Sequence, residues 1–259
     1  MYAMKQQYAQ YLIEKTKDDY DTIAGEFDRT RAYCWEGLEQ FARYAHAGDR
    51  VLDFGCGNGR LFSLFREKSV SYVGADQSCA LIDVARKKYA AEERKGMAEF
   101  VCLVNGALPF PDASFDCIFS IAALHHIPSK ELRERLLQEF ERVLKPNGCV
   151  VITVWNLWQK KYRALIMRHT LKKLMGISPL DLFDVFIPWK TGKQETMAER
   201  YYHCFTIREL LVLLKSAGFH IAESGYFGGK TKRFNMYAVA TKEYNKEKNN
   251  HGIPTKAIH

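Results

Sequence analysis

A glycine-rich turn directly after a short apolar segment constrains this chain more than any other feature. Residues 50–54 (Arg-Val-Leu-Asp-Phe) predict a buried strand, residues 55–59 (Gly-Cys-Gly-Asn-Gly) a turn, and residues 60–68 a helix. Glycine lets the backbone approach a ligand closely, and the first N–H groups of a following helix point at that ligand. This order of elements is typical of sites that bind nucleotide-like molecules. Any tight turn with positive φ also selects glycine, so the turn alone does not establish such a site.

Strands and helices alternate along most of the chain. Helices are predicted in the first 45 residues and at residues 78–94, 130–144 and 206–217. Strands are predicted at residues 71–75, 99–104, 115–121, 149–155, 219–224 and 237–241. This rhythm predicts an α/β fold in which a mostly parallel seven-stranded sheet carries helices on both faces, preceded by an N-terminal helical cap.

The segment 157–200 breaks this alternation. It predicts an insertion made of a basic helix and a loop that runs through Pro179, Pro188 and Gly192. We expect one domain over residues 1–242, since a chain of this length is ample for one core. The polar residues 243–259 predict a flexible tail.

The cysteines and the apolar runs indicate the class of protein. Seven cysteines stand at positions 34, 56, 79, 102, 117, 149 and 204, without a Cys-x-x-Cys pair. This odd, scattered set argues against a disulfide framework and a zinc ribbon, so we expect reduced core cysteines and no metal. No apolar run approaches the ~20 residues that cross a bilayer, and the first residues lack a signal-peptide core. We therefore expect a cytoplasmic protein without membrane contact.

Basic residues are concentrated in two places. The chain has a net charge of +8, which suits an anionic partner. Residues 158–175 contain no acid and carry Lys160, Lys161, Arg163, Arg168, Lys172 and Lys173. A second cluster consists of Lys230, Lys232 and Arg233. Such a stripe is either a nucleic-acid contact or a solvated helix face.

Two carboxylates narrow the choice of cofactor. Asp76 follows the second predicted strand, where an acid accepts both hydroxyl hydrogens of a ribose. Asp53 stands immediately before the glycines, where its charge would repel a pyrophosphate but attract an ammonium group. The spacing Gly-x-Gly-x-Gly also lacks the more distant third glycine of dinucleotide sites. These features favour S-adenosylmethionine (SAM), whose methionine part carries an ammonium group.

The residues around these positions resemble the class I SAM-dependent methyltransferases. The resemblance rests on residues 53–59, Asp76, residues 108–116 and residues 144–148. It implies a Rossmann-like fold and SAM as the cofactor. The acid that often contacts the adenine in this superfamily is missing here, and either the amide oxygen of Asn105 or a backbone carbonyl takes its place. The cofactor-binding residues implied are Tyr20, Asp53, Gly55, Gly57, Asp76, Gln77, Asn105 and Ser120.

Further similarities extend over most of the chain and are more specific. They lie at residues 20–24, 27–35, 124–127, Trp155, residues 188–189 and residues 200–205. Together they resemble the tRNA methyltransferases that esterify 5-carboxymethyluridine at the wobble position. This resemblance implies the tRNA anticodon arm as a partner and a small activator subunit as a second one. The basic insertion would then contact phosphates, and an extruded base would enter the site.

The residue types fit that reaction, because a carboxylate is already a nucleophile at neutral pH and needs orientation more than a base. Arg31, His125 and Arg200 are the candidate catalytic residues, since each can hold one carboxylate oxygen while the other attacks. Each has an alternative role: Arg31 pairs with an acid or with SAM, His125 is structural, and Arg200 lies on a plain strand edge. The tryptophans at 35, 155 and 189 are either core residues or stacking platforms.

Two other functions remain open. The same core serves many acceptors, so a methyltransferase of a quinone, lipid or metabolite carboxylate is the first alternative. The apolar segment 180–189 would then line a small-molecule pocket. A SAM-binding subunit without activity is the second alternative.

Overall fold

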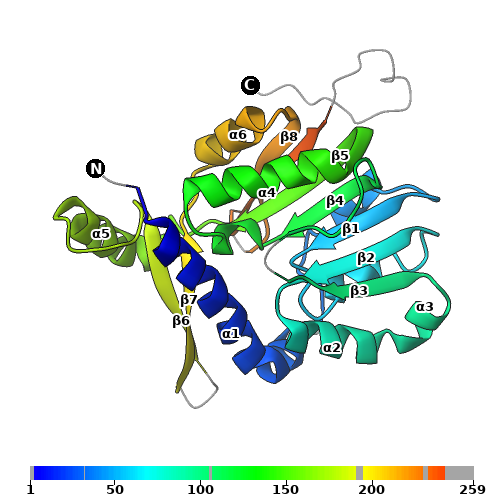
Figure 1. Ribbon diagram of the computed structural model, residues 1–259, viewed down its shortest axis with the longest axis horizontal. Coiled ribbons are helices and arrows are strands. Elements are labelled where there is room, and N and C mark those ends of the chain that lie inside the picture. Colours follow the sequence, from blue (N-terminus) through cyan, green and yellow to red (C-terminus); the bar gives the residue numbers. More distant parts are fainter. Residues whose placement is uncertain (1–2, 32, 105–106, 191–194, 230–232, 243–259) are drawn as a thin grey trace.

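A central sheet of seven strands organises the computed structural model, which describes residues 3–31, 33–104, 107–190, 195–229 and 233–242 (Figure 1). Its strands are β1 (Arg50–Phe54), β2 (Ser71–Asp76), β3 (Ala98–Cys102), β4 (Phe115–Ile121), β5 (Leu144–Trp155), β8 (His220–Phe227) and β9 (Asn235–Thr241). They lie in the order β3-β2-β1-β4-β5-β9-β8. The first five strands in this order, β3, β2, β1, β4 and β5, are each parallel to their neighbours. Strand β9 runs antiparallel to both β5 and β8. The predicted sheet is confirmed.

Helices cover both faces of this sheet. The α-helices are α1 (Gln6–Thr30), α2 (Cys79–Lys88), α3 (Ala90–Arg94), α4 (Lys130–Val143), α5 (Lys160–Leu174) and α6 (Ile207–Ser216). Short 3-10 helices are η1 (Glu39–Tyr44), η2 (Arg60–Leu64) and η3 (Leu124–His126). The helical cap predicted before the sheet is therefore present as α1 and η1.

Alternation of side chains along the strands divides the core into two layers. Val51 packs with Phe62 in the layer under η1, η2 and α2. Its neighbour Leu52 packs with Phe140 in the layer under α4 and α6. Successive strand residues point to opposite faces, so an apolar run such as residues 50–54 supplies both layers at once.

The insertion differs from the prediction. Its basic helix is α5, but the expected loop contains a hairpin of β6 (Asp184–Lys190) and β7 (Thr196–His203). Val185, Ile187 and Trp189 are buried at every second position, which is the period of a strand. A two-stranded ribbon consists only of edge strands, which tolerate a proline such as Pro188. Figure 1 shows the hairpin beside α1, away from the central sheet.

The helices around the cofactor turn are also shorter than predicted. A 3-10 helix of five residues, η2, replaces the helix expected at residues 60–68. The helix expected at residues 78–94 is divided at Tyr89 into α2 and α3. The prediction of a long helix whose first N–H groups point at the ligand is therefore wrong, and the turn itself must supply the backbone donors.

The cysteines require a correction as well. Cys79 at the start of α2 and Cys102 at the end of β3 form a disulfide, with 5.2 Å between their Cα atoms. Spacing along the chain could not reveal this pair, because only the parallel pairing of β2 with β3 brings the two residues together. The other five cysteines are free, and four of them are buried, as expected for core thiols.

The described residues were considered for membrane spans and for clusters of metal-binding side chains. Within those ranges, none of the helices is both long and apolar enough to cross a bilayer. Three or more His, Cys, Asp or Glu side chains arranged to hold a metal ion are likewise not found in that part of the chain.

Candidate active site

A cavity of about 400 Å³ lies where the carboxyl ends of the central strands meet α1 and the β6–β7 hairpin. The end of β1, the turn after it and the end of β2 form one part of its wall. The segment after β4, the last residue of β5, α1 and the hairpin form another part. This location matches the general rule that ligands of parallel α/β sheets bind at the carboxyl ends of the strands.

The turn after β1 approaches its neighbours so closely that it needs glycine. Gly55 has a φ of +73°, and an added Cβ would lie 2.4 Å from the Cβ of Ala123. Gly57 also has positive φ, and its N–H donates a hydrogen bond of 2.8 Å to Oδ2 of Asp76. The glycines therefore let the backbone form this wall of the cavity and orient the acid at the end of β2.

Asp76 is held by two backbone donors. Its Oδ2 accepts from Gly57, and its Oδ1 accepts from the N–H of Ser78 at 2.9 Å. Burial is the main cause that raises its pKa, and these two hydrogen bonds act in the opposite direction. Each carboxylate oxygen keeps a second lone pair, so Asp76 can accept the hydroxyl hydrogens of a ribose.

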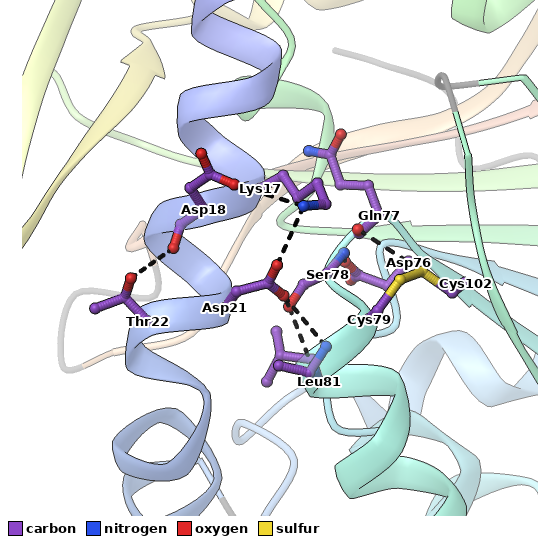
Figure 2. Close-up of polar contacts among 11 residues, drawn as sticks. Lys17, Asp18, Asp21, Thr22, Asp76, Gln77, Ser78, Cys79, Leu81 and Cys102 are labelled. Carbon is purple, nitrogen blue, oxygen red and sulfur yellow. Dashed lines mark hydrogen bonds and ion pairs between the residues drawn. A yellow bond between two sulfur atoms is a disulfide. The ribbon is translucent and has the colours of Figure 1, made fainter.

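The segment after Asp76 joins α1 to α2 (Figure 2). Asp21 of α1 accepts a hydrogen bond of 2.6 Å from Oγ of Ser78 and one of 3.2 Å from the N–H of Ala80. Lys17 lies 3.4 Å from the other oxygen of Asp21. The N-terminal helix is thereby fixed to the same loop that carries Asp76 and Gln77.

Asp53 is a buried carboxylate without a salt-bridge partner among the described residues. It is 1% exposed, and its Oδ2 accepts a hydrogen bond of 2.5 Å from the hydroxyl of Tyr72. Burial raises its pKa to about 7, against the opposing effect of the Tyr72 hydroxyl. A cationic group in the cavity would neutralise this charge, as the sequence predicts for the ammonium group of SAM.

The second part of the cavity contains an arginine enclosed by aromatic rings. Arg200 of β7 is 5% exposed, and its guanidinium carbon lies 4.7 Å from the ring centre of Trp189 and 5.9 Å from that of Trp155. Arg31, at the end of α1, lies 5.3 Å from the same Trp189 ring. Within the described chain, neither arginine forms a salt bridge with a carboxylate, so two positive charges face the cavity.

Several donors around Arg200 lack an acceptor. The backbone N–H of Trp155 donates to Nδ1 of His125 at 3.3 Å, so the hydrogen of a neutral His125 is on Nε2. Burial keeps His125 neutral by lowering its pKa well below the usual value. The buried atoms with no hydrogen-bond partner in the described residues include His125 Nε2, Trp155 Nε1, Trp189 Nε1 and Arg200 Nε. All four are donors on residues that line the cavity, so an anion with several acceptor oxygens that reached them would satisfy them.

The structure brings most of the predicted site residues into this cavity. Those that line it are Tyr20, Arg31, Asp53, Gly55, Gly57, Asp76, Gln77, His125 and Arg200. Ser120 is fully buried and is not among the lining residues, and Asn105 lies outside the described residues.

The structure also adds residues that the sequence argument missed or left ambiguous. His126 lines the cavity beside His125. Arg60 also lines it, and its guanidinium group lies over the rings of Phe27 and Trp35. The tryptophans at 35, 155 and 189 all line the cavity, although 155 and 189 also pack in the core of the insertion. A Trp at the last position of a strand, as in β5, is the signal that could have placed one of them at the sheet edge.

Comparison with known proteins agrees with this geometry. Residues 52–152 match a family described as "Methyltransferase domain". A protein of Encephalitozoon cuniculi named "Putative methyltransferase" is 31% identical over 224 residues, which cover 86% of this chain and 93% of that protein. The chain belongs to the class I SAM-dependent methyltransferases.

Other relatives of this methyltransferase carry more specific names. The tRNA (carboxymethyluridine(34)-5-O)-methyltransferase of Schizosaccharomyces pombe is 29% identical over 251 residues, covering 90% of this chain and 98% of that protein. A solved SAM-dependent methyltransferase of Methanosarcina mazei is 25% identical with a TM-score of 0.64, covering 81% of this chain and 98% of the other. A Haloferax volcanii methyltransferase, solved as a complex with the Trm112 activator, shares the fold at 19% identity and a TM-score of 0.62, over 89% and 98% of the chains.

The cavity of this methyltransferase fits SAM on two grounds. The buried Asp53 carboxylate forms no salt bridge with a described residue, and an ammonium group would supply a cationic partner. Asp76 and the tight Gly55 turn offer acceptors and close backbone approach for a nucleoside. Bound SAM supplies an electrophilic methyl group on a sulfonium.

Proposed function

We propose that this methyltransferase esterifies the carboxylate of 5-carboxymethyluridine at the wobble position of tRNA. The observation that carries the proposal is the cluster of unpaired donors around Arg200, which calls for an anionic acceptor. The S. pombe relative, named for this reaction, aligns with 90% of the chain, so the likeness extends well beyond the cofactor turn.

The reaction does not require a general acid or a general base from the protein. One carboxylate oxygen forms a bond to the methyl carbon, the carbon–sulfur bond breaks with its electron pair returning to sulfur, and no proton is transferred. The protein must hold the acceptor in line and exclude water. Arg31, Arg200 and the neutral His125 are donors that can bind the other oxygen. Buried His125 cannot act as a general acid near neutral pH, because burial lowers its pKa far below 6.5.

We further propose that α5 binds the phosphates of the tRNA. Lys160, Lys161, Arg168 and Lys172 are exposed on this helix. The prediction that Lys173 belongs to the basic face is wrong. Its side chain is only 9% exposed, and its Nζ lies 3.8 Å from Oδ1 of Asp181, so it belongs to the core of the insertion. The second basic cluster contributes Arg233, which lies over the Tyr226 ring, while Lys230 and Lys232 fall outside the described residues.

A small activator subunit is a further candidate partner. The support is the shared fold with the H. volcanii methyltransferase that was solved together with an activator. The proposal also includes a single domain over residues 1–242. It includes a cytosolic location as well, because tRNA is decoded in the cytosol. Co-purification of the chain with a small activator protein, compared with purification alone, tests the partner.

A small-molecule carboxylate is the second candidate acceptor, since aromatic rings form much of the wall around Arg200. One assay separates the two. Purified protein with methyl-labelled SAM is offered total tRNA with 5-carboxymethyluridine, tRNA lacking it, and small carboxylic acids. We expect label only in the modified tRNA, in an ester that mild alkali cleaves. Label in unmodified tRNA or only in small acids would contradict the proposal.

Three variants test the chemistry in that assay. Replacement of Arg31, His125 or Arg200 by Gln should reduce turnover by about 30- to 1000-fold for the residue that holds the acceptor, because an oriented charged hydrogen bond is lost in the transition state. The affinity for SAM and tRNA should change much less. Arg94→Gln, an exposed residue on α3, is the control. Turnover should also fall below about pH 5, where the acceptor carboxylate becomes protonated.

A further inference from the structure

The hydroxyl of Tyr20 links two residues of the cavity that are far apart in sequence. Nη1 of Arg200 donates to this hydroxyl at 3.2 Å, and the hydroxyl lies 2.8 Å from Nε2 of His126. On its other side, Nδ1 of His126 lies 2.8 Å from the carbonyl oxygen of Tyr201. α1, η3 and β7 are thus joined by one continuous chain of hydrogen bonds.

The direction of every bond in this chain is fixed by chemistry. A carbonyl only accepts, so Nδ1 of His126 carries a hydrogen and donates to Tyr201. Burial lowers the pKa of His126 to about 3, so its Nε2 keeps a lone pair and accepts the hydroxyl hydrogen of Tyr20. The Tyr20 oxygen then presents its own lone pairs, and Arg200, which can only donate, supplies the hydrogen they accept.

This arrangement leaves one edge of the Arg200 guanidinium free. Nη1 is the only guanidinium nitrogen with a hydrogen bond to a described residue, and Nε is buried without a partner. The Nε–H and Nη2–H groups form the parallel fork that matches the two oxygens of a carboxylate. The rings of Trp189 and Tyr202 lie 4.7 and 5.2 Å from the guanidinium carbon and restrict its plane.

We propose that Tyr20 and His126 are positioning residues, which hold the Arg200 guanidinium so that its Nε/Nη2 edge receives the acceptor carboxylate. The inference rests on the proposed esterification and adds the group that orients the acceptor. It also gives Tyr20 a role on the acceptor side of the cavity, in place of the cofactor contact that the sequence predicts. His126 acts on Arg200 through Tyr20, because its two ring nitrogens are engaged by the Tyr20 hydroxyl and the carbonyl oxygen of Tyr201.

A mutant cycle tests this relay. Tyr20→Phe removes only the hydroxyl, and His126→Asn keeps a donor near Nδ1 while removing the acceptor for Tyr20. Each should lower kcat on modified tRNA by about 10- to 100-fold, with SAM and tRNA affinities within about twofold of wild type. Arg200→Lys, which loses the fork, should lower kcat by about 100-fold or more. Tyr20→Phe combined with Arg200→Lys should be no worse than Arg200→Lys alone, because Tyr20 acts only through Arg200. Additive losses would overturn the proposal.

A spectroscopic measurement keeps the test independent of turnover. The Nε–H proton signal of Arg200, observed by NMR in the intact protein with S-adenosylhomocysteine, should shift when 5-carboxymethyluridine is added. Tyr20→Phe should broaden this signal, whereas Tyr11→Phe, an exposed position on the same helix, should not. If the chemical shift of the Arg200 Nε–H proton does not change when the nucleoside is added, the inference is overturned even if the enzyme is active. A wild-type protein that shifts the signal but does not methylate modified tRNA would instead refute the proposed reaction.

Discussion

The hydroxyl of Tyr72 donates a hydrogen bond of 2.5 Å to Oδ2 of Asp53, and both side chains are almost completely buried. The bond joins adjacent parallel strands, because Tyr72 belongs to β2 and Asp53 to β1. Asp53 also lines the cavity, where a cationic ligand would neutralise its charge. The free protein therefore carries a carboxyl group whose pKa, raised by burial to about 7, depends on what occupies the cavity.

SAM affinity should consequently depend on pH. An ammonium group binds the ionised form of Asp53, so the proton that Asp53 takes up below about pH 7 must be lost on binding. The dissociation constant should rise about tenfold for each pH unit below 7, and rise again above about pH 8 as the amino group of SAM loses its proton. Calorimetry between pH 5 and pH 9 measures both limbs.

Asp53→Asn is the matched variant for that titration. The amide keeps an acceptor for Tyr72 but cannot ionise, so SAM should bind weakly at every pH and the acidic limb should disappear. A wild-type affinity that stays constant from pH 5 to pH 7 would show that Asp53 does not hold the ammonium group.

Asp76 should contribute through the ribose hydroxyls. Asp76→Ala removes hydrogen bonds to a charged acceptor, each worth roughly 1.5–3 kcal/mol, so SAM should bind at least about tenfold more weakly. The variant also leaves the N–H groups of Gly57 and Ser78 unpaired. Comparison of S-adenosylhomocysteine with its 2′-deoxy form separates the two effects: wild type should discriminate between them and Asp76→Ala should not. If both proteins discriminate equally between the two ligands, Asp76 does not bind the ribose hydroxyls.

The basic face of α5 should control tRNA affinity and its salt dependence. Reversal of Lys160, Lys161 and Lys172 to Glu removes phosphate contacts, and each lost contact should reduce the slope of log affinity against log salt by about 1. SAM affinity should not change. Filter binding of tRNA at several salt concentrations provides the slope.

Matched reversals on another surface control for net charge. Lys87 on α2, Arg94 on α3 and Lys95 directly after α3 are exposed, and Figure 1 shows these helices on the opposite side of the molecule from α5. Their change to Glu should leave the slope near that of wild type. Lys173 is excluded from the first set, because its ion pair with Asp181 is buried and its loss would destabilise the insertion. Equal slopes for both sets would make α5 an ordinary solvated helix.

The disulfide between Cys79 and Cys102 should stabilise the cofactor-binding part of the fold. It closes a loop with a sequence separation of 23, for which loss of chain entropy in the unfolded state predicts about 3 kcal/mol. Cys79→Ala should lower the free energy of unfolding by about this amount in oxidising buffer and by much less with a reductant present. Urea titration measures it. Cys34→Ala, at a free cysteine, should behave alike in both buffers.

The sequence alone determined the α/β fold and predicted the part of the cavity around Asp53 and Asp76, because both depend on local patterns. The run of residues 50–54 followed by glycines fixes a strand and a turn within ten positions, and Asp53 and Asp76 stand at strand ends that a parallel sheet brings to one edge. The hairpin β6–β7 carried the same period-two signal in Val185, Ile187 and Trp189. Its proline concealed that signal, since a loop and an edge strand accept proline equally well.

Only the tertiary structure decided the acceptor half. Tyr20 and Arg200 are 180 positions apart, and Tyr20 and His126 are 106 apart, so no spacing along the chain relates them. Their contact arises because α1 packs against β7 on one side and against α2 on the other, and His126 is buried and neutral beside it. Burial likewise distinguishes Lys173 from the other basic residues of its helix, and the pairing of β2 with β3 brings Cys79 to Cys102. Charge state, bond direction and cross-links depend on which surfaces are excluded from water, and packing alone determines that.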